Sequence, residues 1–150
     1  MPLPIPNAHF IWYCAWFSLP TAIYAYSHPA SAHFAVVPAS VWATSLLYWR
    51  NPVRDSWRRT LDIAVVFSGL TYQTYYAVHH TPPTQLGVYT ALIGTSAVCY
   101  GLGHYLWKRG HTWPATYAHA AIHFVANIAN MVLYNGVNDS LKKTTNKYLV

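Results

Sequence analysis

The stretch TYAHAAIHFVANIANMVLY, residues 116–134, decides the fold class of this chain. It is long and apolar enough to cross a bilayer, since a transmembrane helix needs roughly 20 predominantly apolar residues. It nevertheless carries His119, His123, Asn127 and Asn130. At about 100° per residue, these four side chains fall within roughly 80° of one another on a helix. Because lipid offers polar groups no partner, we expect this stripe to face protein, a ligand or water.

The composition of the whole chain is that of a membrane protein. Hydrophobic residues make up 54% of the 150 residues, aromatic residues 17% and charged residues only 8%. That is too little charge for the surface of a soluble domain. The pI near 9.4 would suit a nucleic-acid partner. However, the basic residues cluster at the boundaries of apolar segments, so phosphate headgroups of a lipid bilayer explain them better. We expect no nucleic-acid partner.

Polar and proline-containing segments divide the chain into apolar stretches of about the length of one membrane span each. The dividing segments are SHPAS, RNPVRDSWRR, HHTPP and KRGHTWP. The sequence therefore predicts an all-α integral membrane bundle of about five transmembrane helices, a single domain over residues 1–150. The expected helices cover residues 8–26, 30–49, 60–78, 84–107 and 115–134, and residues 135–150 form a loose tail. A four-span alternative leaves the last helix re-entrant or the first helix peripheral.

The basic residues also predict how the helices are oriented. Five helices place two of the loops on one side, and these loops carry six of the nine Lys and Arg residues: Arg50, Arg54, Arg58, Arg59, Lys108 and Arg109. The loops SHPAS and HHTPPT carry none. Because positive residues in short loops stay on the cytoplasmic side, we expect the basic loops to face inward. The lysines of the tail, Lys142, Lys143 and Lys147, would then lie on the opposite side.

Two further helix faces carry polar or small residues. On the helix expected over residues 60–78 and just beyond it, a second polar stripe falls within roughly 60°: Asp62, Gly69, Gln73, Tyr76 and His80. The helix over residues 84–107 has a glycine at every seventh position, namely Gly87, Gly94 and Gly101. A small face of this kind allows the backbone of another helix to approach closely. These faces predict a packed bundle.

Four ionisable residues fall at one depth, in the half of the bundle near the basic loops: Asp62, His104, His119 and His123. Histidines four residues apart on a helix present two imidazoles on one face, and a third histidine with water or a carboxylate completes tetrahedral zinc. We therefore consider a zinc site with His119, His123 and His104 as ligands. Asp62 would hold a histidine tautomer or orient a metal-bound water.

The same residues allow other interpretations. Histidines on facing helices also hold haem, and both His104 with His119 and His33 with His79 lie at matching depths. Few small residues surround these histidines to make room for a porphyrin, so haem is less favoured than zinc. In the simplest alternative, the histidines satisfy each other or backbone carbonyls, and Asp62 pairs with a nearby arginine at the interface.

The order of three motifs resembles a known group of membrane proteins. SLLYW with Ser45, RRTLDIAVVFSG with Asp62, and HAAIH with His119 and His123 are similar in order to the motifs of the CREST superfamily. That group includes alkaline ceramidases and the progestin and adipoQ receptors, and its enzymes hydrolyse lipid amides with zinc-bound water. The resemblance implies that His119 and His123 are zinc ligands, and that Ser45 and Asp62 shape the water site.

The chain departs from the CREST pattern at two points. The family has a histidine one turn after the serine, whereas Trp49 stands one turn after Ser45, so His104 would have to substitute from another helix. The family has seven helices, and this chain has room for about five.

Two functions of different class are therefore predicted. One is a zinc-dependent hydrolase, or a relic of one, that acts on a lipid through His119, His123 and His104 as ligands, with Asp62 and Ser45 at the water site. The other is a non-catalytic structural or accessory membrane subunit, whose polar stripes pack against its own helices or against partner subunits. The small size, the aromatic content and the glycine face suit the second function.

Overall fold

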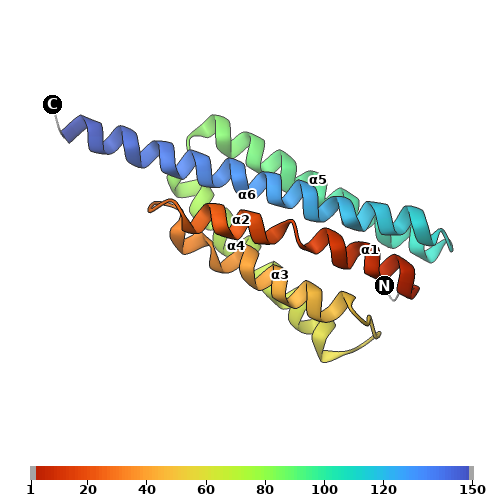
Figure 1. Ribbon diagram of the computed structural model, residues 1–150. Helices are drawn as coiled ribbons and strands as arrows, with labels where there is room; N and C mark the ends of the chain where they lie inside the picture. The colour runs from red at the N-terminus through yellow and green to blue at the C-terminus, as the bar shows by residue number, and fades with distance from the viewer. Residues whose placement is uncertain (1–2, 149–150) are drawn as a thin grey trace.

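A computed structural model describes the backbone of residues 3–148 and the side chains of residues 3–143. The described chain is all-helical and contains no strand. Its elements are α1 (Ile5–Ala15), α2 (Ser18–Tyr26), the 3₁₀ helix η1 (Ala32–Phe34), α3 (Val36–Trp49), α4 (Trp57–His80), α5 (Pro83–Lys108) and α6 (Thr112–Tyr148). Successive passes run antiparallel, with α1 and α2 together forming the first pass (Figure 1).

The unbroken helix expected over residues 8–26 is wrong, because the first pass breaks between α1 and α2. The N–H groups of Trp16 and Phe17 bond to carbonyls three residues back, at 3.2 and 3.1 Å, so the backbone tightens there. Pro20 explains the break, since it has no N–H to bond the Trp16 carbonyl and its ring crowds that carbonyl. The break falls inside the pass and leaves its direction unchanged (Figure 1).

The last helix is longer than expected. α6 continues through Tyr148, so residues 135–148, which we expected to be loose, are helical. Two contacts tie the first part of this segment to the bundle. Asn138 Nδ2 donates a 3.2 Å hydrogen bond to Ser31 Oγ, and a Cβ at Gly136 would lie 2.9 Å from the Thr81 side chain. Up to residue 148, the end of the described backbone, no proline or left-handed residue then ends the helix.

The other bounds differ by fewer residues. α3 begins at Val36 rather than near residue 30, because the preceding residues form a turn and η1. α4 and α5 begin and end within three residues of the expected bounds. Ser56 caps the start of α4, and its hydroxyl accepts a 3.4 Å hydrogen bond from the Arg59 backbone N–H. This cap places Arg59 in the first turn of α4 and Asp62 one turn later.

The helices pack around α6 and α3. α6 lies along α5 and also contacts α1 and α2, whereas α3 contacts α1, α2 and α4. α4 and α5 therefore form the two edges of the bundle. They are joined near their connection by a 3.1 Å hydrogen bond between the Thr74 and Tyr89 hydroxyls, and they diverge toward the opposite end (Figure 1).

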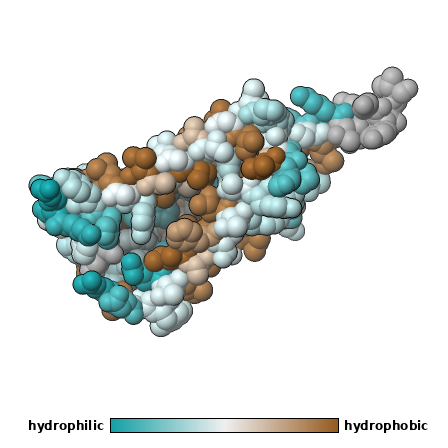
Figure 2. Space-filling view, turned by 180° about the vertical axis from the view of Figure 1, so that it is seen from behind, coloured by the Kyte–Doolittle hydropathy of each residue, from teal (hydrophilic) through white to brown (hydrophobic). Residues whose placement is uncertain are grey.

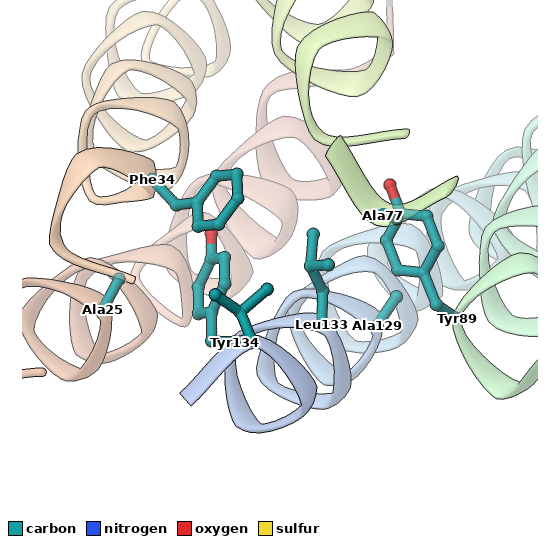
Figure 3. Close-up of a cluster of buried hydrophobic side chains, with 8 residues drawn as sticks. Ala25, Phe34, Ala77, Tyr89, Ala129, Leu133 and Tyr134 are labelled. Carbon is teal, nitrogen blue, oxygen red and sulfur yellow. The ribbon is translucent and has the colours of Figure 1, made fainter. Parts of the chain in front are cut away.

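Two apolar clusters hold the bundle together. The larger one lies toward the α4–α5 connection, where Phe34 stacks on Tyr134 with ring centroids 5.4 Å apart (Figure 3). Its buried members are Ala25, Phe34, Ala77, Tyr89, Ala129, Leu133, Tyr134 and Val137. The smaller cluster joins the start of the chain to the end of α3 and contains Leu3, Ala8, Ile11, Tyr48 and Trp49.

The polar stripe of α6 faces the protein interior, as predicted. His123 and Asn127 are buried. Asn127 Nδ2 donates hydrogen bonds of 3.1 Å to Ser18 Oγ and 2.6 Å to the His123 carbonyl. Farther along the same face, the Tyr134 hydroxyl accepts a 2.7 Å bond from Gln73 Nε2 of α4. Hydrogen bonds to α2 and α4 thus hold Asn127 and Tyr134 on this face of α6.

The predicted close approach at the glycine face of α5 is wrong. A Cβ added at Gly87, Gly94 or Gly101 would meet nothing within 4 Å. The buried residues of α5 are Tyr89, Ser96 and Gly103, which also recur every seventh position but on another face. At Gly103 an added Cβ would lie 3.3 Å from the Ala115 carbonyl oxygen of α6. The close helix contact therefore falls at Gly103, and the glycine face points outward.

Two helices of the described chain are long and apolar enough to cross a membrane: α5, and α6 over residues 112–143. Only 17% of the most apolar part of α5 is buried, so this apolar surface is not the core of the fold. The other passes do not meet that test. α3 has 14 residues, about 21 Å of helix, and α4 contains Asp62, Gln73 and two histidines.

The basic loops lie at one end of the molecule, hereafter the basic end, which comprises the α3–α4 and α5–α6 connections with Arg58 and Arg59 (Figure 1). Figure 2 shows hydrophilic residues gathered at the two ends of the molecule, with hydrophobic residues between them. The charge pattern of the sequence predicted that the two basic loops lie at the same end, and the structure confirms this. The distribution of hydrophilic and hydrophobic residues matches a bilayer, whose apolar core lies between two polar interfaces.

Candidate functional site

A small pocket opens at the basic end, between the diverging ends of α4 and α5. Its volume is about 60 Å³, enough for a few waters or one small polar group. Figure 2 shows a hollow at this end, between two hydrophilic patches. The residues that line the pocket come from α3, α4, α5 and α6: Tyr48, Trp49, Arg59, Asp62, Ile63, Tyr100, His104 and His119.

The pocket brings together three of the four ionisable residues that the sequence placed at one depth. Asp62, His104 and His119 line it, but His123 does not. His123 lies one turn further along α6, with its ring centroid 6.0 Å from that of His119. The predicted convergence of residues from α4, α5 and α6 is thus found for three of the four side chains.

Asp62 is held by two hydroxyl groups of α3. Its Oδ1 accepts hydrogen bonds from Ser45 Oγ at 2.8 Å and from Thr44 Oγ1 at 2.9 Å. Both donors are buried, and bonds of this kind to a charged acceptor contribute about 1.5–3 kcal/mol each. The resemblance pointed to Ser45 beside Asp62, whereas Thr44 was missed. The signal for Thr44 was its position next to Ser45, because two adjacent hydroxyls of one helix can reach the same carboxylate.

Asp62 forms no ion pair with a neighbouring arginine. Within the described chain the one ion pair joins Arg54 and Asp55, at 3.6 Å, and both side chains are exposed. The alternative in which Asp62 pairs with an interfacial arginine is therefore not found. Arg59 lines the same pocket as Asp62, so a cation and a carboxylate face one cavity without binding each other.

Several buried polar atoms around the pocket have no hydrogen-bond partner among the described residues. They are the Tyr48 hydroxyl, Trp49 Nε1 and, behind His119, His123 Nε2. Tyr48 and Trp49 are only 4% and 3% exposed. A buried polar group left unpaired costs about 1–3 kcal/mol, so such atoms normally bond to water or to a ligand. Sequence reasoning gave neither side chain a role in binding, although Trp49 shares a helix face with Ser45.

The donor set does not fit the predicted zinc ion. Among residues with described side chains, no group of three or more His, Cys, Asp or Glu residues is placed to hold a metal. His104, His119 and His123 therefore do not assemble as a ligand set. Trp49, which takes the position of the third ligand in the CREST pattern, packs its ring against His119 with centroids 4.8 Å apart. Its indole nitrogen can only donate a hydrogen bond and cannot ligate a metal.

The pocket is also too small for haem. A volume of about 60 Å³ beside His104 and His119 leaves no space for a porphyrin. At the opposite end, His33 packs against Phe34 and Tyr76, and His79 Nδ1 donates a 2.7 Å hydrogen bond to the Tyr75 carbonyl of its own helix. The histidine pairs that suggested haem thus serve local contacts in the described structure.

The pocket has a deep wall and an open side. Tyr48 and Trp49 of α3 are its most buried lining residues and mark the deep wall. The most exposed lining residues are Ile63 of α4 and Tyr100 of α5, at 36% and 55%, so we place the open side between them. Both belong to the exposed apolar surface of the edge helices. A molecule lying along that surface can therefore reach the pocket with its polar end.

Comparison with protein-family models, curated proteins and solved structures finds no match to this chain. The resemblance to the CREST superfamily therefore rests only on the motifs around Ser45, Asp62, His119 and His123.

Proposed function

We propose that this chain is a polytopic integral membrane protein with five passes, and that its pocket at the basic end binds the polar end of a lipid. The observation that carries this proposal is the pair of unpaired buried donors, Tyr48 and Trp49, in a pocket also lined by Arg59 and Asp62. A water-filled pocket would satisfy these groups as well. The apolar surface on both sides of the opening favours a lipid.

The exposed surface supports the membrane part of the proposal. Large hydrophobic side chains cover the outside of α4 and α5, among them Phe67, Tyr75 and Val98, and Val98 is 69% exposed. Soluble monomers rarely expose apolar patches of such extent. The basic loops at one end suit the anionic headgroups of the cytoplasmic leaflet, which attract Lys and Arg near the membrane surface.

Binding without hydrolysis is the chemistry that we propose. The CREST resemblance implies a zinc-dependent hydrolase, but Trp49 stands at the position of its third ligand. We therefore propose a relic of such a site, which keeps the hydrogen bond between Ser45 and Asp62 and lacks a complete ligand set. Its pocket then serves to hold a lipid rather than to activate a water on zinc.

The proposal is tested by the composition of the purified protein. The full chain, extracted in a mild detergent, should carry bound lipid in native mass spectra and contain less than stoichiometric zinc. The double variant Tyr48→Phe/Trp49→Phe should lose the lipid, because it removes both donors and keeps one aromatic ring at each position. A matched control, Tyr26→Phe/Trp57→Phe, changes exposed residues outside the pocket and should retain it. One zinc per chain would contradict the proposal and favour the hydrolase.

A second candidate function is that of an accessory subunit, and the outward glycine face favours it. Gly87, Gly94 and Gly101 leave open space beside α5, where a helix of another chain could approach closely. A bulky residue at the centre of the face, as in Gly94→Leu, should then keep the helix of the other chain away. Disulfide cross-linking between cysteines on the two helices should therefore be abolished. If the purified protein is monomeric and no cross-link forms through this face, the accessory role loses its support.

A further inference from the structure

The pocket offers its occupant mainly hydrogen-bond donors. An indole N–H is a donor only, so Trp49 requires an acceptor atom from whatever fills the pocket. The Tyr48 hydroxyl lies in the same wall and is also without a partner in the described chain. Arg59 adds a planar guanidinium, whose forked donors match the oxygens of a phosphate or carboxylate. These three side chains together call for a group with several acceptor oxygens.

The charges around the pocket favour an anion. Six Lys and Arg residues stand at the basic end, against two acids, Asp55 and Asp62. Asp55 is paired with Arg54, and Oδ1 of Asp62 is already held by the hydroxyls of α3. An ammonium group could bind Asp62 and donate to the Tyr48 hydroxyl, but it has no acceptor atom and would leave the donor-only indole N–H of Trp49 unpaired. An anionic oxygen group satisfies the donors and is attracted by the surrounding charge.

We propose that the pocket binds the phosphate of a lipid headgroup from the leaflet at the basic end, with Tyr48, Trp49 and Arg59 as its donors. This inference rests on the proposed function, because it names the chemistry of the lipid that the pocket takes. The phosphate enters between Ile63 and Tyr100, and the acyl chains lie along the apolar outer surface of α4 and α5. The small volume admits the phosphate itself and leaves a larger headgroup substituent outside.

The experiment compares ligands that differ by one group. Binding of dioctanoyl phosphatidic acid, dioctanoylglycerol and inorganic phosphate to the full chain in detergent is measured by titration calorimetry. Phosphatidic acid should bind at least about tenfold more tightly than dioctanoylglycerol, since each charge-assisted hydrogen bond is worth that order of affinity. It should also bind more tightly than inorganic phosphate, which has no chains to contact the apolar surface.

Variants locate the phosphate. Arg59→Gln should weaken the binding of phosphatidic acid by about tenfold or more. Arg59→Lys should weaken it by less, because lysine keeps the charge but lacks the forked donors of a guanidinium group. Arg54→Gln, at an exposed arginine of the α3–α4 connection, should have little effect on this binding. Asp62→Asn should strengthen binding, since it removes a negative charge beside the phosphate. Circular dichroism in the same detergent shows whether each variant remains helical.

Each contrary result has a distinct meaning. Equal binding of phosphatidic acid and dioctanoylglycerol would overturn the phosphate inference and leave lipid binding intact. Equal binding of inorganic phosphate and phosphatidic acid would overturn the lipid as the source of the phosphate. If Arg54→Gln weakens binding as much as Arg59→Gln, or Asp62→Asn weakens it, the phosphate does not lie in this pocket. If no lipid binds at all, the proposed function fails with the inference.

Discussion

The Ser45 hydroxyl donates a 2.8 Å hydrogen bond to Oδ1 of Asp62 and so joins α3 to α4 at the basic end. Thr44 donates a second bond to the same oxygen at 2.9 Å. These bonds supply the partners that a carboxylate at the edge of an apolar bundle requires. They also orient Asp62 toward α3, beside the unpaired donors of Tyr48 and Trp49. The stability of the pocket wall therefore depends on two hydroxyl groups.

Removing one of these hydroxyls should destabilise the protein measurably. Ser45→Ala is expected to lower the free energy of unfolding by about 1.5–3 kcal/mol, because it removes a buried hydrogen bond to a charged group. Thr71→Ala is a suitable control, since the Thr71 hydroxyl bonds only to the Phe67 carbonyl of its own exposed helix face. Denaturant titration in detergent micelles measures both variants. Equal stability of Ser45→Ala and Thr71→Ala would contradict the role of Ser45.

The two glycines Gly103 and Gly94 of α5 should respond to alanine with opposite signs. At Gly103 the added Cβ would press on the Ala115 carbonyl oxygen, which cannot move without shifting α6. A close contact of this kind is expected to cost about 1–3 kcal/mol. At Gly94 the added Cβ meets nothing, so Gly94→Ala should stabilise the helix by about 0.5–1 kcal/mol. Thermal unfolding of the two variants in one detergent checks the difference in sign.

The hydrogen bond between Gln73 and Tyr134 should show coupling between α4 and α6. Gln73 Nε2 donates to the Tyr134 hydroxyl at 2.7 Å, and both side chains are buried. In a double-mutant cycle with Gln73→Leu and Tyr134→Phe, we expect a coupling free energy of about 0.5–3 kcal/mol. Each single variant leaves one polar group unpaired, and the double variant leaves neither. Additive losses of stability would show that the bond does not connect the two helices.

Side-specific labelling tests the topology. With Cys14 and Cys99 replaced, single cysteines at Val53 and Gly110 should react with a membrane-impermeant maleimide from one face of the membrane. A cysteine at His28, in the connection before α3, should react only from the other face. The reason is that the loops with Val53 and Gly110 lie at the same end of the bundle (Figure 1). Reaction of Val53 and Gly110 positions from opposite faces would rule out the five-pass arrangement.

The fold was predictable where local signals were strong. The polar stripe with His123 and Asn127 indicated a buried face, and the structure confirms it. The break near Trp16 was also encoded, by Pro20, but the uniformly apolar residues around it concealed the signal. The glycine repeat misled because Gly103, two positions beyond Gly101, makes the close contact. Spacing along one helix gives a periodicity, and only the partner helix decides which face is covered.

The candidate site was predictable in part. Residues of three helices were placed at one depth from topology alone, and Asp62, His104 and His119 indeed line one pocket. The sequence did not show that Trp49 would pack on His119 and that His123 would lie behind it. These are questions of side-chain direction, which depend on how adjacent helices rotate against each other. The unpaired donors of Tyr48 and Trp49 are likewise visible only once the neighbours are known.

Photo-cross-linking shows directly whether a lipid binds in the pocket. Phosphatidic acid with a diazirine on the first carbons of an acyl chain is incorporated with the full chain into nanodiscs and irradiated. The labelled residues are then mapped by peptide mass spectrometry. Label should concentrate beside the opening, around Ile63 and Tyr100, and Tyr48→Phe/Trp49→Phe should remove it. Uniform labelling of the apolar surface, including Val88 and Val98 of α5, with no change in the double variant would contradict lipid binding in the pocket.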